Sequence, residues 1–338
     1  MKEYFLGVDV GGTKTHCLIS DQNGRAIGFG EAGPGNHEGV GYDGLFQALK
    51  ASSDLAIIQA GISPDEISGG GFGIAGYDWP SERQSTLDVI SKLNLKAKIE
   101  AVNDAVVGML AGASRGWGVG VDAGTGDNVY GINPAGQIAH MTGCGEFFGE
   151  YGGSGSVVLR AVQSVSYQWS GRGGPTALSE AFIQLAGAKN LDDLLEGLSQ
   201  GSYNLWSEAA PVVFKVANEG DQVARDAIAW VARELAESTL AIIRKLKMEK
   251  SGFEVVMIGS MFNGGEVFIT PFQKRILEGA PKAEFVKLNV PPVVGGVLLG
   301  MKVAGKDPIE NRGRLIQTTT ELLDQKSIPE NVEIVKDS

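Results

Sequence analysis

The first apolar segments of the chain are separated by short polar turns. Residues 4–32 contain three apolar runs divided by a glycine pair and by DQNG, a pattern typical of three strands joined by tight turns. Residues 117–143 repeat the pattern around the glycine turn DAGTGDN. We interpret the repeat as an internal duplication into two lobes that each present a glycine turn to a shared cleft. Chance agreement of two such units is the alternative.

Helical periodicity follows each group of strands, which indicates an α/β lobe in each half of the chain. In the first half we expect helices near 44–60, 81–93 and 105–113, with strands at 67–75 and 98–102. In the second half we expect helices near 156–169, 175–186 and 206–218, from 221 onward, after 260 and at 293–304, with strands at 253–260 and near 285.

The length of the chain predicts two domains, because 338 residues exceed the usual size of one hydrophobic core. We place the boundary at the sequence ASRGWG. Residues 1–114 are assigned to an N-terminal lobe and residues 115–305 to a C-terminal lobe with helical additions. Residues 306–338 are expected to form a C-terminal extension.

The acidic composition narrows the classes of partner. A formal net charge of −11 argues against nonspecific binding to nucleic acid or to anionic membranes, and no apolar run is long enough to span a bilayer. Two cysteines and three histidines occur without metal-ligand spacing, and Cys17 lies in an apolar run that predicts a reduced core thiol. We therefore expect a cytoplasmic protein.

The sequence GVDVGGTK has the features of a phosphate-binding turn. Gly11 and Gly12 leave their backbone N–H groups open to phosphate oxygens, while Thr13 and Lys14 add a hydroxyl and a positive charge. Asp9, just before the turn, has the chemistry to hold a hydrated Mg²⁺ ion. An ordinary hairpin turn is the alternative.

A second glycine turn, formed by Gly124, Thr125 and Gly126, favours the phosphate interpretation. Two turns from duplicated lobes can clamp a polyphosphate from both sides. Two competing nucleotide motifs fail: GMKVAGK has Walker spacing but lacks the final hydroxyl residue, and GFGIAG is followed by YDWP where a helix would have to begin. We interpret them as the end of a helix and as a close-packed strand.

Asn103 and Asp104 follow the predicted strand KIEAV, at the edge where α/β lobes usually bind ligands. Phosphoryl transfer to a hydroxyl needs a carboxylate that accepts its proton, and Asp104 is the best-placed candidate. Asn103 is a candidate substrate contact, and a helix cap is the alternative role at this position. Two loops are further candidates, GPGNHEG with Asn36 and residues 143–156 with Glu150, each against a simple turn or connector.

Together these motifs resemble the actin-like ATPase superfamily, and within it the N-acetylglucosamine kinase and BadF/BadG/BcrA/BcrD-type ATPase family, over residues 4–304. The resemblance implies that DVGGTKT and AGTGDN are the phosphate motifs and that Asp104 is the catalytic base. It implies an adenosine motif in VVMIGSMFNGG with Gly259 and Ser260. The sugar contacts that it implies are Asn36, the region of Gly76, Asn128 and Glu150.

The resemblance also implies an α/β fold of two actin-like, ribonuclease H-like lobes, each a mixed sheet with flanking helices, around a central nucleotide and sugar cleft. It implies an ATP- and Mg²⁺-dependent kinase of an amino sugar: N-acetylglucosamine, or a close relative such as N-acetylmuramic acid or glucosamine. A regulatory or activator ATPase with a protein partner, and a sugar sensor without turnover, are the alternatives. We expect a sugar as partner, not nucleic acid or a membrane, and leave open whether the chain forms a homodimer.

The chain departs from the family pattern at one motif. Where the family usually has aspartate followed by glutamate, this sequence has Glu150 and Tyr151. The longer acidic side chain changes the pocket, so the identity of the sugar stays open. Cys144 is the only cysteine in the second lobe, which argues against the relatives that hold an iron–sulfur cluster with a cysteine pair.

Overall fold

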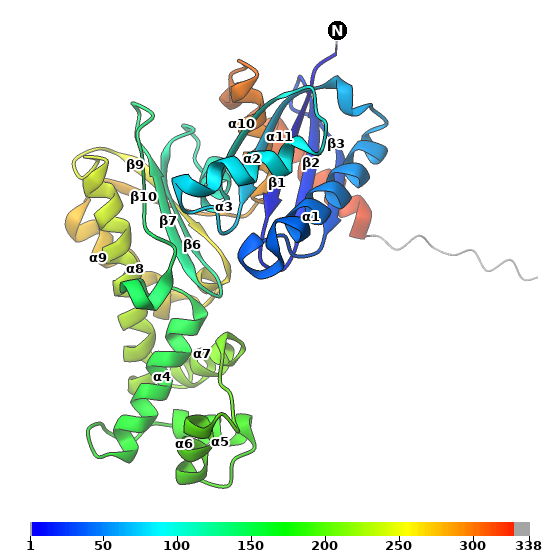
Figure 1. Cartoon of the computed structure of the whole chain (residues 1–338). Coiled ribbons are helices and arrows are strands. Elements are labelled where there is room, and N and C mark those ends of the chain that lie inside the picture. Colours follow the sequence, from blue (N-terminus) through cyan, green and yellow to red (C-terminus); the bar gives the residue numbers. More distant parts are fainter. Residues whose placement is uncertain (1, 328–338) are drawn as a thin grey trace, which may run out of the picture. The chain divides into compact units, whose positions relative to one another are not determined.

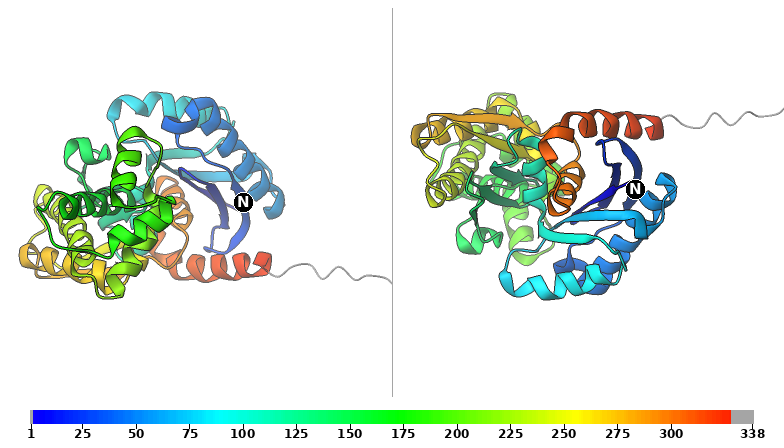
Figure 2. Two further views of the ribbon diagram at one scale, coloured as in Figure 1. Left: turned by 90° about the horizontal axis from the view of Figure 1, so that it is seen from below. Right: turned by 90° about the horizontal axis from the view of Figure 1, so that it is seen from above.

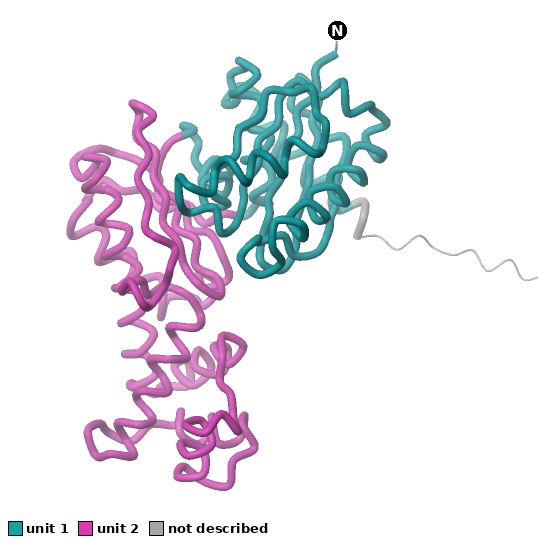
Figure 3. Tube along the Cα trace, in the orientation of Figure 1, with its two compact units in different colours: residues 1–116, 289–338 teal, residues 117–288 magenta. Residues whose placement is uncertain are grey.

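The computed structural model describes residues 2–327 and gathers them into two compact units (Figure 1, Figure 3). Unit 1 contains the described residues up to Gly116 together with those from Asn289 onward. Unit 2 contains residues 117–288. The first division of the chain lies close to the boundary expected after residue 114.

Unit 1 is built on a mixed five-stranded sheet with the strand order β3-β2-β1-β4-β5. The strands are β1 (Tyr4–Val10), β2 (Thr15–Asp21), β3 (Ala26–Ala32), β4 (Ile67–Ile74) and β5 (Lys98–Asn103). The first three strands pair antiparallel, whereas β4 and β5 run parallel to β1. The carboxyl ends of β1, β4 and β5 therefore meet at one edge of the sheet.

Helices cover both faces of this sheet, with α1 and α2 on one side and α10 and α11 on the other (Figure 2). The helices of unit 1 are α1 (His37–Ala60), α2 (Arg83–Ser91), α3 (Asp104–Gly112), α10 (Val293–Val303) and α11 (Pro308–Ser327). Within α1 the backbone is kinked at Gly41, where φ is 69° and ψ is 173°. The regular part of α1 therefore begins near the expected residue 44.

Glycines explain how closely α10 packs on the sheet. A Cβ atom at Gly7 or at Gly71 would lie 2.2 Å from a backbone atom of α10, and one at Gly296 would lie 2.9 Å from Val8 N. The helix and the sheet thus touch backbone to backbone, which only glycine permits. This packing assigns residues 289–305 to unit 1, whereas the sequence-based boundary gave them to the C-terminal lobe.

Unit 2 is built on a second mixed sheet, with the order β10-β9-β6-β7-β8. Its strands are β6 (Gly118–Ala123), β7 (Asp127–Ile132), β8 (Ile138–His140), β9 (Phe253–Ile258) and β10 (Ala283–Lys287). The first three pair antiparallel, and β9 and β10 run parallel to β6. Order and directions repeat those of unit 1, which supports the internal duplication.

Unit 2 also carries a helical insertion between β8 and α8. The helices of the insertion are α4 (Ser154–Trp169), α5 (Leu178–Ala186), α6 (Leu191–Gln200) and α7 (Ala210–Asn218), and the other long helices of unit 2 are α8 (Gln222–Lys245) and α9 (Glu266–Gly279). The apolar side of α8, the helix expected from residue 221 onward, is buried, including Ile228 and Leu235. The sequence analysis missed α6, a short helix that Asn190 caps by accepting from Asp193 N at 2.9 Å.

Two mixed sheets flanked by helices confirm the predicted α/β fold class. Cys17 is fully buried and free, which confirms the prediction of a reduced core thiol, and burial raises the pKa of this thiol to about 12. No helix among residues 2–327 combines the length and the apolar character that a membrane span requires.

Candidate functional site

The first glycine turn joins β1 to β2 in unit 1. Gly11 N donates to Lys14 O at 2.9 Å, and Gly11 O accepts from Gly35 N at 3.1 Å. Thr13 and Lys14 are exposed at the tip of this turn, as is Gly12. Asp9 precedes the turn and is partly buried. The segment therefore has the geometry of a hairpin turn. Its tip is exposed, so a ligand can reach it.

The glycines at the tips of both turns are not required by the protein itself. Gly12 in unit 1 and Gly124 and Gly126 in unit 2 lie outside the left-handed region of φ, and a Cβ atom at each would meet nothing within 4 Å. By contrast, Gly24 and Gly136, which close the second turn of each repeat, have φ of 75° and 77°. The tip glycines leave open space beside exposed backbone, which is what close approach of a phosphate needs.

Asn36 and Gly76, both expected to contact the sugar, lie side by side in unit 1. Asn36 caps α1, since its Oδ1 accepts from Glu38 N at 2.9 Å. Gly76 has a φ of 77°, and a Cβ atom there would lie 2.5 Å from the same Oδ1. A side chain at position 76 would therefore displace Asn36, which makes glycine necessary at this position.

Asn103 and Asp104 lie together at the start of α3. Asn103 is the N-cap of α3, because its Oδ1 accepts from Ala105 N at 2.9 Å. Asp104 is the first residue of the helix, and its Oδ1 also accepts from Ala105 N at 2.9 Å. Since Asn103 already caps the helix, capping alone does not account for a carboxylate at position 104.

The amide of Asn103 is engaged by the protein at both ends. Its Nδ2 donates to Asp78 Oδ1 at 3.0 Å, and the side chain is nearly buried, with 3% exposure. These bonds fix Asn103 at the start of α3 beside Asp104, and its expected contact with substrate stays a prediction.

Glu82 extends this network and was missed in the sequence. Its Oε2 accepts from Asp78 N at 3.0 Å and from Trp79 N at 2.8 Å, and its Oε1 lies 3.5 Å from His37 Nε2. Glu82 thereby connects the loop after β4 to the start of α1. A signal was present, because proline at position 80 followed by a glutamate resembles the start of a capped helical turn.

The second glycine turn joins β6 to β7 and is held by the start of α4. Gly124 N donates to Gly126 O at 2.9 Å. The carbonyl oxygens of Gly124 and Thr125 accept from Ser154 N at 2.8 Å and from Gly155 N at 3.2 Å. The carbonyl groups of the turn are thus bonded inward, so its conformation is fixed by the fold.

Gly259 and Ser260, the expected adenosine motif, follow β9 at the same end of the sheet. Gly259 has a φ of 95°, and a Cβ atom there would lie 2.4 Å from Ala123 O at the end of β6. This close approach requires glycine. Ser260 begins the 3₁₀ turn Ser260–Asn263 and is exposed.

A pocket of about 730 Å³ in unit 2 lies beside these turns. Pro211, Phe214 and Met261 give it apolar walls, and Ser260 is among its polar groups. Ser154 also lines it, the residue whose N–H binds the carbonyl of the second glycine turn. The volume and the mixture of walls are those of a site for a small molecule or cofactor.

Four carboxylates gather near the β6–β7 turn. Burial, and after it the negative charge of Glu150, raise the pKa of Asp127 to about 7. Burial also raises the pKa of Asp122, to about 6. Glu146 is exposed and accepts from Ser156 Oγ at 3.0 Å. The sequence analysis did not single out Asp127 or Glu146.

Glu150 is held in place through one of its carboxylate oxygens. The residue is 2% exposed, and its Oε1 accepts from Thr142 N at 2.8 Å, while its Oε2 has no hydrogen-bond partner among the described residues. Tyr151, the departure from the family motif, packs edge-on against Trp230 of α8 with 5.0 Å between ring centroids. Tyr151 therefore serves to pack the protein at this position.

Asn128, next to Asp127, is partly buried at the start of β7.

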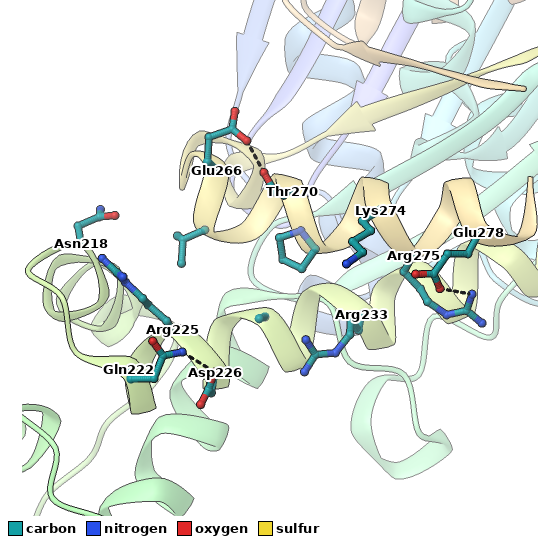
Figure 4. A pocket seen from close by; sticks show the side chains of 13 residues that line it. Asn218, Gln222, Arg225, Asp226, Arg233, Glu266, Thr270, Lys274, Arg275 and Glu278 are labelled. Carbon is teal, nitrogen blue, oxygen red and sulfur yellow. Dashed lines mark hydrogen bonds and ion pairs between the residues drawn. The ribbon is translucent and has the colours of Figure 1, made fainter. Parts of the chain in front are cut away.

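A second groove of about 720 Å³ runs between α8 and α9 (Figure 4). Two pairs of polar groups in its lining are bonded to each other: Arg275 Nη1 donates to Glu278 Oε2 at 3.2 Å, and Gln222 Nε2 donates to Asp226 Oδ1 at 2.9 Å. None of the site residues indicated by the sequence lines it. We therefore place the candidate site at the glycine turns and not in this groove.

Two sheets of one topology, each with a glycine turn after its central strand, define an α/β protein of the actin-like ATPase class. The chain belongs to the BadF/BadG/BcrA/BcrD ATPase family, whose model matches residues 6–300. The family resemblance seen in the sequence is thus confirmed.

Several known proteins are similar over nearly their whole length. The chain is 25% identical over 299 residues to an N-acetylmuramic acid/N-acetylglucosamine kinase of Clostridium acetobutylicum, covering 88% of this chain and 98% of that protein. It is 26% identical over 316 residues to an N-acetyl-D-glucosamine kinase of Dictyostelium discoideum, covering 89% and 98%. A ROK family glucokinase from Streptomyces griseus, solved with glucose and AMPPNP, shares the fold with a TM-score of 0.56 and 18% identity, covering 88% and 99%.

Proposed function

We propose that the protein is an ATP-dependent kinase that phosphorylates an amino sugar, in the class of N-acetylglucosamine, N-acetylmuramic acid and glucosamine. Its family and its two full-length relatives, which are named as kinases of such sugars, support this proposal. Their names do not favour the alternative of a regulatory ATPase that acts on a protein partner.

One observation carries the nucleotide part of the proposal. Ser154 both lines the 730 Å³ pocket of unit 2 and donates its N–H to the carbonyl of Gly124 in the glycine turn. A nucleoside in the pocket would therefore have its phosphates close to the exposed tip of this turn. We assign the phosphates to two turns: Gly11, Gly12, Thr13 and Lys14, and Gly124, Thr125 and Gly126. Gly259 and Ser260 are assigned to the adenosine.

The chemistry proposed for the acceptor begins with Asp104, which takes the proton of the attacking hydroxyl as general base. Its place at the carboxyl end of β5, next to an independent helix cap, supports this role. We assign sugar binding to Asn36, Gly76, Asn103, Asn128 and Glu150. Phosphoryl transfer then depends mainly on positioning and on neutralising the charge of the phosphate.

The acidic, histidine and cysteine side chains of the described residues fit Mg²⁺ only as an ion that keeps most of its waters. No group of three or more histidine, cysteine or acidic side chains among the described residues has the arrangement to hold a metal. Mg²⁺ commonly keeps several waters and takes one or two carboxylates together with phosphates. We propose that Asp9 holds it, through water, beside the first phosphate turn, where it would neutralise phosphate charge.

The test is ATP consumption by the full chain with Mg²⁺ across a panel of free sugars, with the mass of each product measured. We expect turnover to require an amino sugar and to yield a sugar phosphate heavier by one phosphoryl group. ATP hydrolysis at the same rate without sugar, or no phosphorylated sugar from any member of the panel, would contradict the proposed function.

A further inference from the structure

Unit 2 buries negative charge beside its glycine turn without neutralising it. Glu150 is 2% exposed and its Oε2 has no partner among the described residues. Asp127 lies against the same loop, because a Cβ atom at Gly152 would be 2.7 Å from the Asp127 side chain. Glu146, a third carboxylate, is bonded to Ser156 Oγ at the start of α4. An unpartnered, buried carboxylate oxygen costs free energy unless a ligand supplies its partner.

No positive side chain offsets these charges in the part of the chain that is described. The charged groups that act on Asp127 are Glu150, Asp122 and Glu146, all of them negative, and only the Gly153 N–H stabilises its ionised form. The polar contacts of Glu150 and Glu146 come from a backbone N–H and a hydroxyl, which are neutral donors. The cluster is therefore prepared for a cation from outside the protein.

We propose that Asp127, Glu146 and Glu150 select an amino sugar whose nitrogen is unacylated and carries a positive charge, and discriminate against its N-acylated form. The inference rests on the proposed function and narrows it, because Asn128 and Glu150 are the sugar contacts assigned to unit 2. An ammonium group donates up to three hydrogen bonds and brings the missing charge. An acetamido group is neutral and bulkier, so it would leave the carboxylates unmatched.

The expected size of the effect follows from electrostatics. Opposite charges attract more strongly in a partly buried site than in bulk water. Part of this attraction is lost to desolvation of the ammonium group, and a tenfold preference needs only about 1.4 kcal/mol. A preference of tenfold or more for the charged sugar is therefore within reach of this cluster.

The test is calorimetric binding of three sugars to the full chain: glucosamine, N-acetylglucosamine and glucose, which has a hydroxyl in place of the amine. Each titration is done in EDTA, with and without a non-hydrolysable ATP analogue. We expect glucosamine to bind at least tenfold more tightly than the other two. Asp127→Asn and Glu146→Gln should each reduce this preference several-fold, whereas Glu249→Gln, on the turn after α8 in the same unit, should leave it unchanged.

The alternatives give different results. A preference for N-acetylglucosamine, or an unchanged preference in both Asp127→Asn and Glu146→Gln, would overturn the inference. Glucosamine binding that appears only when Mg²⁺ replaces EDTA would assign the carboxylates to the metal ion and overturn it as well. Phosphorylation of N-acetylglucosamine in preference to glucosamine would leave the kinase proposal intact while this inference fails, so the two failures are distinguishable.

Discussion

The two units treat their site carboxylates in opposite ways. In unit 1, Asp78 and Glu82 accept hydrogen bonds from the Asn103 side chain and from backbone N–H groups, so their charges are used to hold neighbouring groups. In unit 2, Asp127 is crowded by other carboxylates and Glu150 leaves one oxygen without a partner. Carboxylates whose hydrogen bonds are all made within the protein hold their neighbours in a fixed geometry. Carboxylates that lack a partner of opposite charge are stabilised when a ligand supplies one. Unit 1 thus has the properties of the positioning half, and unit 2 those of the half that gains most from binding.

The largest effect is expected from Asp104→Asn in unit 1. A general base contributes on the order of a hundred- to ten-thousand-fold, so sugar-dependent turnover should fall by that amount while ATP affinity stays nearly unchanged. The melting temperature should change little, because Asn103 and not Asp104 caps α3. Turnover, calorimetry and thermal melting on one preparation test this, with Asp43→Asn on α1 as the control. Full turnover in Asp104→Asn would remove this carboxylate from the chemistry.

Asp127→Asn tests the crowded carboxylates of unit 2 through the free energy of unfolding. The pKa of Asp127 is raised from 3.8 to about 7, so between about pH 4 and pH 7 the folded state keeps a proton that the unfolded state has released. Stability therefore falls as pH rises through this window, by on the order of 2–4 kcal/mol at about 1.4 kcal/mol per pKa unit. Asp127→Asn should be more stable than the unmodified chain at pH 8 and similar to it at pH 4.

Urea unfolding at pH 4, 6 and 8 measures this difference, with Glu249→Gln as a control that should follow the unmodified chain at every pH. Equal stability of Asp127→Asn and the unmodified chain at pH 8 would show that the buried charge is neutralised within the protein. It would remove the contrast between the two units.

The glycine turns are expected to behave alike, which sharpens the comparison. Gly12→Val and Gly124→Val each place a branched side chain where no protein atom lies within 4 Å, so the fold should survive. ATP affinity should fall by about tenfold or more, because the side chain occupies the space proposed for phosphate. Gly313→Val in α11 and Gly174→Val in the loop before α5 are matched controls, since their surroundings are equally open. Unchanged ATP binding in both tip variants would exclude the turns as phosphate sites.

Local patterns were enough to predict most elements and the turns between them. The alternation of apolar runs and turn residues gave the repeated strands, because strand and turn preferences act over a few neighbouring residues. The sheet on which α10 packs was not predicted. That choice depends on Gly7, Gly71 and Gly296 meeting from distant parts of the chain. The helix α6 was missed although its leucines, at positions 191, 194, 195 and 198, recur at helical spacing, so the local signal for it was present in the sequence.

The site was predictable to the same extent. The glycine turns and Asp104 stand in recognisable local sequences, but the contacts made by other residues of the candidate site do not. Tyr151 packs on Trp230, 79 positions away by subtraction of their residue numbers, and such a pairing leaves no local signature. The raised pKa of Asp127 likewise arises from burial and from Glu150, both of which are properties of the folded chain.

The smallest effect is expected from Glu82, which acts on the sugar side of unit 1 only through its neighbours. Glu82→Ala removes the acceptor of the Asp78 and Trp79 N–H groups and should loosen the loop that contains Gly76. The KM for sugar should rise a few-fold with kcat and ATP affinity nearly constant. Glu82→Gln should restore most of the loss, since its amide oxygen can still accept both bonds. Glu66→Ala is the control, because Glu66 accepts from Ser63 N at 2.8 Å in a similar turn away from the site residues. If Glu82→Ala weakened ATP binding as much as sugar binding, or if Glu82→Gln gave no rescue, the hydrogen bonds of Glu82 would not position the sugar side, and the two units would not differ as proposed.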